Sequence, residues 1–130
     1  MEYLLNTRNK ATKLRAQAFV NYVPGLILFP DNWSAPWDVY TKLNENDYNS
    51  NNYDIYHWKL LEKAGAVFLP ACGGRDFGLY NSWQGFYWSS TVKDENLIWT
   101  ILFGNNDYVA KVENLSRYAG RSVRLVKEVE

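Results

Sequence analysis

The longest apolar runs of this chain are short and interrupted by glycine and proline. They cover residues 25–30 and 64–71. Short apolar runs bounded by turn-forming residues predict buried strands rather than long helices. Neither run approaches the roughly 18 residues that a membrane-spanning helix needs. We therefore expect short elements joined by long loops, and no membrane insertion.

Two helices are expected. Residues 2–18 open with an apolar cluster typical of the last turns of an amphipathic helix, whose beginning we expect upstream of this sequence. Residues 55–64 follow Asp54, a favourable N-cap, and precede Gly65 at the position where helices commonly end. The buried face of this second helix is expected to hold Ile55, Trp58, Leu61 and also Leu60.

The C-terminal third carries the strongest strand pattern. Residues 97–103 combine β-branched and aromatic side chains, and residues 108–112 can return as a hairpin partner after a Gly-Asn-Asn-Asp turn. An alternating segment at 122–128 predicts a last strand. Long polar connections are expected at 31–53, 71–86 and 113–120. The pattern predicts one α+β domain over residues 1–130, with two helices, short antiparallel strands and long irregular loops.

Charge and cysteine content exclude several classes of protein. Fourteen Lys or Arg balance fourteen Asp or Glu, and no basic cluster stands out, so nucleic-acid binding is not expected. Cys72 is the only cysteine, which rules out an internal disulfide, and we expect it to be a buried, inert thiol. The first twenty residues contain no secretory signal pattern. The compartment stays open between cytoplasmic expression and display on a phage or cell surface.

A catalytic or metal site has little support in the sequence. His57 is the only histidine, and nothing in the sequence places a partner beside it. Ser89 and Ser90 lack the glycine-flanked turn of a hydrolase nucleophile and are expected to form loop hydrogen bonds. The aspartates are scattered without calcium-loop spacing. We expect no enzyme, no cofactor and no metal site, although a dyad of Cys72 and His57 stays open as a weaker alternative.

Six segments, in order over nearly the whole chain, resemble one known family. They include Tyr-Trp-Ser-Ser-Thr and, near the end, Gly-Arg-Ser-Val-Arg-Leu-Val. The family is that of C-type-lectin-like domains abundant in gut Bacteroidales and their phages, which are distantly similar in fold to formylglycine-generating enzymes. The matching residues are Tyr3 to Asn6 with Arg8, and residues 23–33, 58–71, 74–76, 87–91 and 120–126.

The resemblance implies a C-type-lectin-like fold without disulfides that serves as a scaffold for ligand binding. In related variable proteins of diversity-generating retroelements, the stretch between the two motifs above is hypervariable. The corresponding stretch is residues 92–119. The chain departs from the family by beginning inside the usual first helix, without the upstream strand. It also lacks the Glu-Pro-Asn and Trp-Asn-Asp signatures of calcium-dependent sugar binding and the cysteine pair of the related oxidases.

Together these features predict a non-enzymatic recognition domain that presents residues 92–120 to a protein or glycan target. Rigid aromatic side chains beside adaptable amides are typical of binding surfaces, and the zero net charge favours a partner that is not strongly ionic. A structural or degenerate domain of a larger surface or virion protein is the alternative. Oligomeric state and ligand identity stay open. The expected ligand-binding residues are Trp99, Asn105, Asn106, Asp107, Tyr108, Asn114 and Tyr118.

Overall fold

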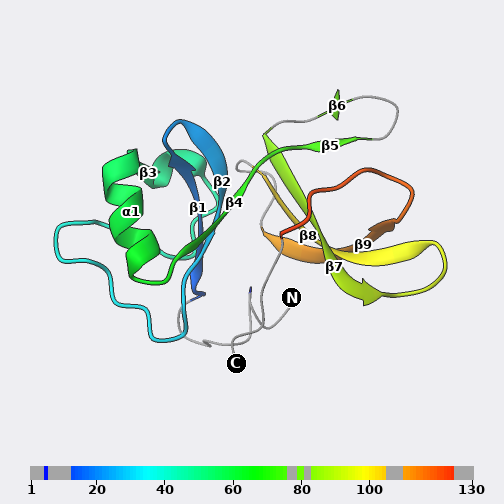
Figure 1. The fold of residues 1–130 in the computed structure, drawn as a ribbon, viewed down its shortest axis with the longest axis horizontal. Helices are drawn as coiled ribbons and strands as arrows, with labels where there is room; N and C mark the ends of the chain where they lie inside the picture. Colours follow the sequence, from blue (N-terminus) through cyan, green and yellow to red (C-terminus); the bar gives the residue numbers. More distant parts are fainter. Residues whose placement is uncertain (1–4, 6–12, 76–78, 81–82, 105–109, 125–130) are drawn as a thin grey trace.

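The computed structural model describes residues 5, 13–75, 79–80, 83–104 and 110–124. Within these ranges the chain forms two main β-sheets, a two-stranded ribbon, one α-helix and one short 3-10 helix (Figure 1). The elements, in chain order, are β1 Arg15–Val20, β2 Val23–Leu28, η2 Tyr48–Ser50, β3 Asn52–Tyr53, α1 Ile55–Lys63, β4 Val67–Pro70, β5 Gly74–Arg75, β6 Leu79–Tyr80, β7 Gln84–Val92, β8 Leu97–Gly104 and β9 Lys111–Ser116.

The first sheet has the strand order β3-β1-β2-β4. Strands β1 and β2 form a tight antiparallel hairpin whose turn residues Asn21 and Tyr22 have positive φ angles of 48° and 67°. Positive φ at both turn positions suits the right-handed twist of a hairpin, although asparagine adopts it far more readily than tyrosine. Strand β4 then pairs with β2, and β3 pairs with β1 in parallel. The central hairpin thus supports the rest of this sheet.

The expectation of a helix over residues 2–18 is wrong for residues 13–18. Residues 15–18 belong to β1, and residues 2–4 and 6–12 lie outside the described residues. Ala16 and Ala18 are fully buried on one face of the strand, where their small side chains let α1 pack close. Arg15 and Gln17 are buried on the opposite face, and an Arg15 Nη1 to Asn46 Oδ1 hydrogen bond of 3.1 Å holds the guanidinium. Burial also lowers the pKa of Arg15.

The second expected helix is confirmed as α1. The Asp54 carboxylate caps it by accepting a 2.8 Å hydrogen bond from the backbone N–H of His57, and Gly65 ends it with a φ of 99°. Trp58 and Leu61 are buried against the first sheet. Ile55, expected on the same face, is the first residue of the helix and is 51% exposed.

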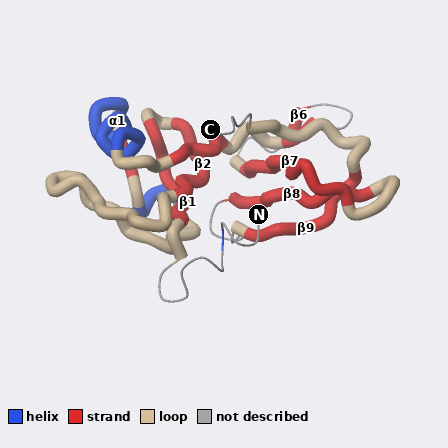
Figure 2. The backbone as a smooth tube through the Cα atoms, turned by 60° about the horizontal axis from the view of Figure 1, so that its bottom comes forward, coloured by secondary structure: helices blue, strands red, loops and turns tan. Residues whose placement is uncertain are grey.

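The second sheet is the antiparallel array β7-β8-β9. Its strands run side by side, and α1 lies on the far side of the first sheet from them (Figure 2). Strand β7 has an irregular register between Trp88 and Val92. Its outer edge receives Ser122, which forms a parallel bridge with Tyr87 through hydrogen bonds to the backbones of Phe86 and Trp88. The C-terminal segment therefore returns along β7, while the rest of the strand expected at 122–128 lies mainly outside the described residues.

A core between the two sheets joins them. Leu26 and Leu69 from the first sheet pack with Tyr87, Ile101 and Phe103 from the second. The Tyr87 hydroxyl crosses this interface and donates a 2.8 Å hydrogen bond to the carbonyl oxygen of Pro70. Burial raises the pKa of Tyr87 to about 12. The two sheets thus share buried side chains and a hydrogen bond.

The fold is therefore mainly β, and the expectation of an α+β domain with two helices is wrong. The strands expected within the apolar runs 25–30 and 64–71 and at 97–103 are confirmed as β2, β4 and β8. Residues 113–116, expected in a polar connection, pair with β8 as part of β9. The Asn-rich segment expected as a surface loop buries Tyr48 completely in the core between the sheets. Cys72, expected to be buried, is exposed.

Candidate functional site

The predicted binding residues lie at different places on the second sheet. Trp99 in β8 and Asn114 in β9 are direct cross-strand partners, so both side chains project from the same face of the sheet. Tyr118 follows β9 in a turn. Residues 105–108, which supply Asn105, Asn106, Asp107 and Tyr108 to the prediction, lie outside the described residues.

The turn between β7 and β8 forms one half of an exposed surface that we call the distal tip, residues 94–96 and 117–118. The Asp94 carboxylate accepts hydrogen bonds from the backbone N–H groups of Asn96 at 2.8 Å and Leu97 at 2.9 Å. This is the local pattern by which aspartate stabilises a turn. The Asp94 carboxylate therefore stabilises the turn.

The other half of the distal tip comes from the segment after β9. The backbone N–H of Arg117 donates to the Asn96 carbonyl at 3.0 Å, and its Nη1 donates to the Glu95 carbonyl at 3.1 Å. The Tyr118 hydroxyl lies 3.2 Å from Asn96 Oδ1 and donates to it. These contacts join two segments that are 22 residues apart in sequence, so the distal tip has a defined shape.

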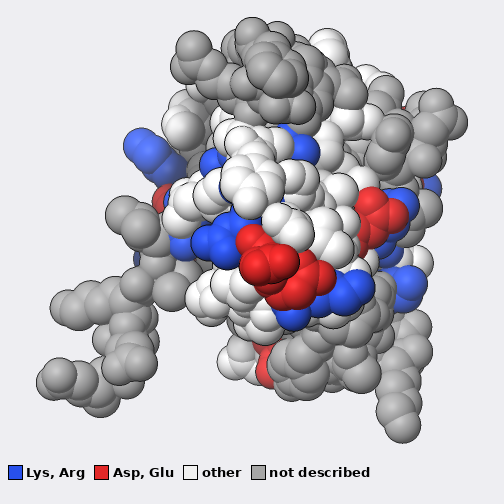
Figure 3. Space-filling view, turned by 90° about the vertical axis from the view of Figure 1, so that its right-hand side faces the viewer, with Lys and Arg blue, Asp and Glu red and all other residues white. Residues whose placement is uncertain are grey.

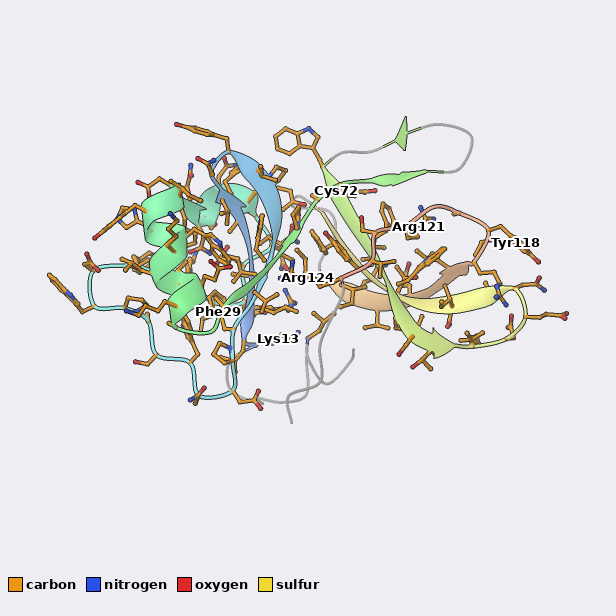
Figure 4. The ribbon with its side chains drawn as sticks, viewed as in Figure 1. Lys13, Phe29, Cys72, Tyr118, Arg121 and Arg124 are labelled. Carbon is orange, nitrogen blue, oxygen red and sulfur yellow. The ribbon has the colours of Figure 1, made fainter. Side chains whose placement is uncertain are left out.

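The distal tip is exposed and carries charges of both signs. Tyr118 is 77% exposed, although its hydroxyl is held, and its side chain extends from the end of the second sheet that lies away from the first (Figure 4). On this face of the molecule Lys and Arg side chains lie directly beside Asp and Glu side chains (Figure 3). A held aromatic ring among mixed charges suits contact with a macromolecule.

Trp99 and Asn114 face the side of the sheet that packs on the first sheet. Alternation along β8 puts Trp99 on the same face as Ile101 and Phe103, which belong to the core between the sheets. Trp99 is half-buried. The Oδ1 atom of Asn114 is buried and has no hydrogen-bond partner among the described residues. These two residues thus lie within the paired strands, whereas Tyr118 lies in the turn after β9.

The opposite face of the second sheet is covered by the returning C-terminal segment. The Arg121 guanidinium lies 4.5 Å from the centre of the Phe86 ring, a cation–π contact, and Figure 4 shows Arg121 over this sheet. Thr100 and Leu102 are buried on this face. The face therefore has a structural role.

Two of the residues considered for catalysis make local contacts in the structure. His57 Nδ1 lies 2.8 Å from the Asp54 carboxylate at the start of α1, where the hydrogen bond from the backbone N–H of His57 is the main cause of a lowered Asp54 pKa. Ser89 Oγ bonds the backbone of Thr91 at the irregular part of β7. In the described ranges, no three His, Cys, Asp or Glu residues gather closely enough to bind a metal ion. Among the same residues, no helix has the length and apolar character to cross a bilayer.

Sequence reasoning missed the residues that build the distal tip around Tyr118. Asp94 and Arg117 hold its two segments, and Asn96 joins them. The Asp-Glu-Asn turn before an apolar strand was a local signal for the first segment. Nothing in the sequence links it to Arg117, because that pairing depends on the register of β8 and β9.

Comparison with known proteins returns no family model, no curated protein and no solved structure that matches this chain. The resemblance to C-type-lectin-like domains therefore rests on the sequence motifs alone.

Proposed function

We propose that this protein is a non-enzymatic recognition domain that binds a protein or glycan target with its distal tip. The observation that carries the proposal is Tyr118, whose largely exposed ring is fixed by the Asn96 side chain on a turn that Arg117 braces. A ring that is already ordered loses little conformational entropy on binding. Such a preorganised, projecting side chain is what a binding surface needs.

The shape of the distal tip supports a macromolecular target. Two hollows among the described residues lie elsewhere, and neither is lined by a tip residue. One is lined by residues 38–40, 49–53 and 57, and the other by residues 58, 62, 65–68, 70 and 124. Small molecules are usually held in concave, largely enclosed pockets. A projecting tip instead makes contact with a surface. Residues 92–120, which the family resemblance marks as the variable stretch, contain the whole tip.

A binding screen tests this proposal. A glycan array and a panel of purified bacterial surface proteins are probed with the chain 1–130, and each ligand found is re-measured with Tyr118→Ala and with Asn96→Ala. We expect a rise in Kd of about tenfold or more for Tyr118→Ala. Tyr22→Ala is the matched control, because Tyr22 is 89% exposed in the turn between β1 and β2.

Two results would contradict the proposal. One is a screen in which no ligand binds. The other is a ligand whose affinity is unchanged by both tip substitutions. Diversification is tested separately by sequencing the neighbouring DNA for a reverse transcriptase gene and a near-copy of the segment that encodes residues 92–126.

A further inference from the structure

A second hollow lies on the first sheet, far along the chain from the distal tip. It has a volume of about 370 Å³ and is lined by residues 38–40, 49–53 and His57. We call it the Tyr40 groove. Its volume is at the small end of the range for ligand pockets, about 300–1,000 Å³. The groove is formed where the Asn-rich loop folds back against β3 and the start of α1.

Hydrogen bonds made by two buried residues, Asn51 and Tyr53, fix the floor of the Tyr40 groove. The Asn51 side chain pairs with the backbone of Lys42 in both directions, since its Nδ2 donates to the Lys42 carbonyl at 2.8 Å and its Oδ1 accepts from the Lys42 N–H at 2.9 Å. The buried Tyr53 hydroxyl lies 2.9 Å from the Tyr40 carbonyl oxygen. Burial raises the pKa of Tyr53, so this hydroxyl stays protonated and can donate. The groove is therefore preformed.

The rim of the Tyr40 groove offers an aromatic ring and several hydrogen-bonding groups. Tyr40 is 76% exposed although its backbone is anchored. Asn49 and Asn52 are exposed beside it, and the His57 ring is held by the Asp54 carboxylate at 2.8 Å and by an edge-on contact with Tyr56. Each amide side chain carries both a donor and an acceptor. This combination matches adjacent hydroxyl groups, which also donate and accept.

The charge of the lining narrows the class of ligand. The lining residues that the structure describes contain no Lys or Arg, and Asp38 adds a carboxylate, so an anionic ligand is disfavoured. A quaternary ammonium ion would need several exposed ring faces around it, but Tyr53 is buried and Tyr40 alone presents an exposed tyrosine ring in the lining. A neutral sugar ring has apolar C–H faces and a rim of hydroxyl groups. It therefore fits both the exposed ring of Tyr40 and the hydrogen-bonding side chains of the groove.

We propose that the Tyr40 groove is a second binding site that takes a neutral saccharide, stacked on Tyr40 and hydrogen-bonded by Asn52 and the His57 ring. The site is independent of the distal tip, because none of the described residues of 92–120 lines it. The protein would then have two recognition surfaces, one on each main sheet.

Nuclear magnetic resonance of the ¹⁵N-labelled chain 1–130 tests the proposal. The probes are glucose, galactose, mannose, N-acetylglucosamine and the disaccharides made of two units of each. Each is titrated to about 10 mM, a concentration at which the weak binding of single sugars can be detected. We expect shifts of the backbone amides of residues 49–53 and 57, with residues 94–118 unmoved. Tyr40→Ala and Asn52→Ala are expected to raise Kd about tenfold, while Tyr22→Ala leaves it unchanged.

Several outcomes would overturn the proposal. No shift with any probe would do so, as would shifts that persist in both Tyr40→Ala and Asn52→Ala. Tetramethylammonium is titrated in parallel, and its binding in place of the sugars would assign the groove to a cation instead. Loss of sugar binding in Tyr118→Ala, with Tyr40→Ala unaffected, would move the site to the distal tip. A folded state with dispersed amide signals in every variant confirms that the comparison is valid.

Discussion

The two main sheets are buried to different extents. The first sheet is covered on both faces, by α1 on one side and by the second sheet on the other. The second sheet is buried in the half that holds Tyr87, Ile101 and Phe103, which meet the first sheet, and Thr100 and Leu102, which face the other way. Its other half ends in the exposed distal tip. One continuous strand, β8, thus connects a tightly packed interior to a surface on which substitutions are expected to cost little.

The largest expected effect tests whether the two sheets unfold as one unit. Phe103→Ala removes a fully buried ring from the core between the sheets and should lower the free energy of unfolding by about 3–5 kcal/mol. Phe29→Ala, in the core under α1, is the matched variant. Calorimetry should show one transition in the parent chain and a lower melting temperature in both variants. Two separate transitions, each sensitive to one variant, would break the single-domain interpretation.

A smaller loss of stability is expected when a side chain is added at Gly25, where β2 and β4 approach closely. The Cβ of Gly25→Ala would overlap the Phe68 ring and come within 2.5 Å of the Leu69 carbonyl oxygen. Because the backbone oxygen cannot easily move, we expect a loss of about 1–3 kcal/mol in urea unfolding. Gly120→Ala, at an exposed glycine, is the control. Equal stability of both variants would show that the first sheet is looser than described.

Alkaline pH should weaken the contact between the sheets. Folding raises the pKa of Tyr87 from about 10 to about 12, so its contribution to stability is complete below pH 10 and is lost as the pH rises toward 12. Tyr87→Phe should lower the free energy of unfolding by about 1 kcal/mol at pH 8. Above pH 10 the stability of this variant should fall less steeply than that of the parent chain. Some loss should persist, because burial also raises the pKa of Tyr48, whose hydroxyl donates to the Trp83 carbonyl at 2.6 Å.

Urea unfolding between pH 8 and pH 11.5 measures this effect. Tyr118→Phe provides the control, because Tyr118 is exposed at the distal tip. An alkaline loss of the same steepness in Tyr87→Phe and in the parent chain would contradict the assigned role of the Tyr87 hydroxyl.

The smallest effect is expected at the distal tip. Tyr118→Ala removes one exposed hydrogen bond and should change the free energy of unfolding by no more than about 0.5 kcal/mol. Chemical denaturation of this variant beside Phe103→Ala compares the two ends of the second sheet directly. A loss above about 1 kcal/mol in Tyr118→Ala would show that the tip belongs to the cooperative core.

Local signals predicted the elements whose stability is largely local. Asp54 and Gly65 mark both ends of α1, and the apolar run at 97–103 marks β8. Strand β1 was missed because Ala, Arg and Gln are good helix formers and because the burial of Arg15 depends on Asn46, 31 residues away. Strand β9 was missed in part because an edge strand can carry polar residues.

The candidate sites were harder to predict than the elements. Tyr118 was identified from its type and place in the chain, but the contact with Asn96 that holds it depends on strand register. The Tyr40 groove was not predicted at all. Its floor requires Asn51 to clamp Lys42, and an asparagine in an Asn-rich segment looks like any other loop residue until the chain has folded.

The brace at the distal tip has a consequence for how many sequences this scaffold can display. Arg117 grips the turn through the carbonyl oxygens of residues 95 and 96, which every amino acid possesses. Asp94 likewise bonds to backbone N–H groups, which only proline lacks. Position 95 can therefore exchange one side chain for another while the loop keeps its course, whereas the side chain of Asn96 also accepts the hydrogen bond of the Tyr118 hydroxyl. Asp94 and Arg117 thus hold the backbone of a loop whose exposed side chain can change.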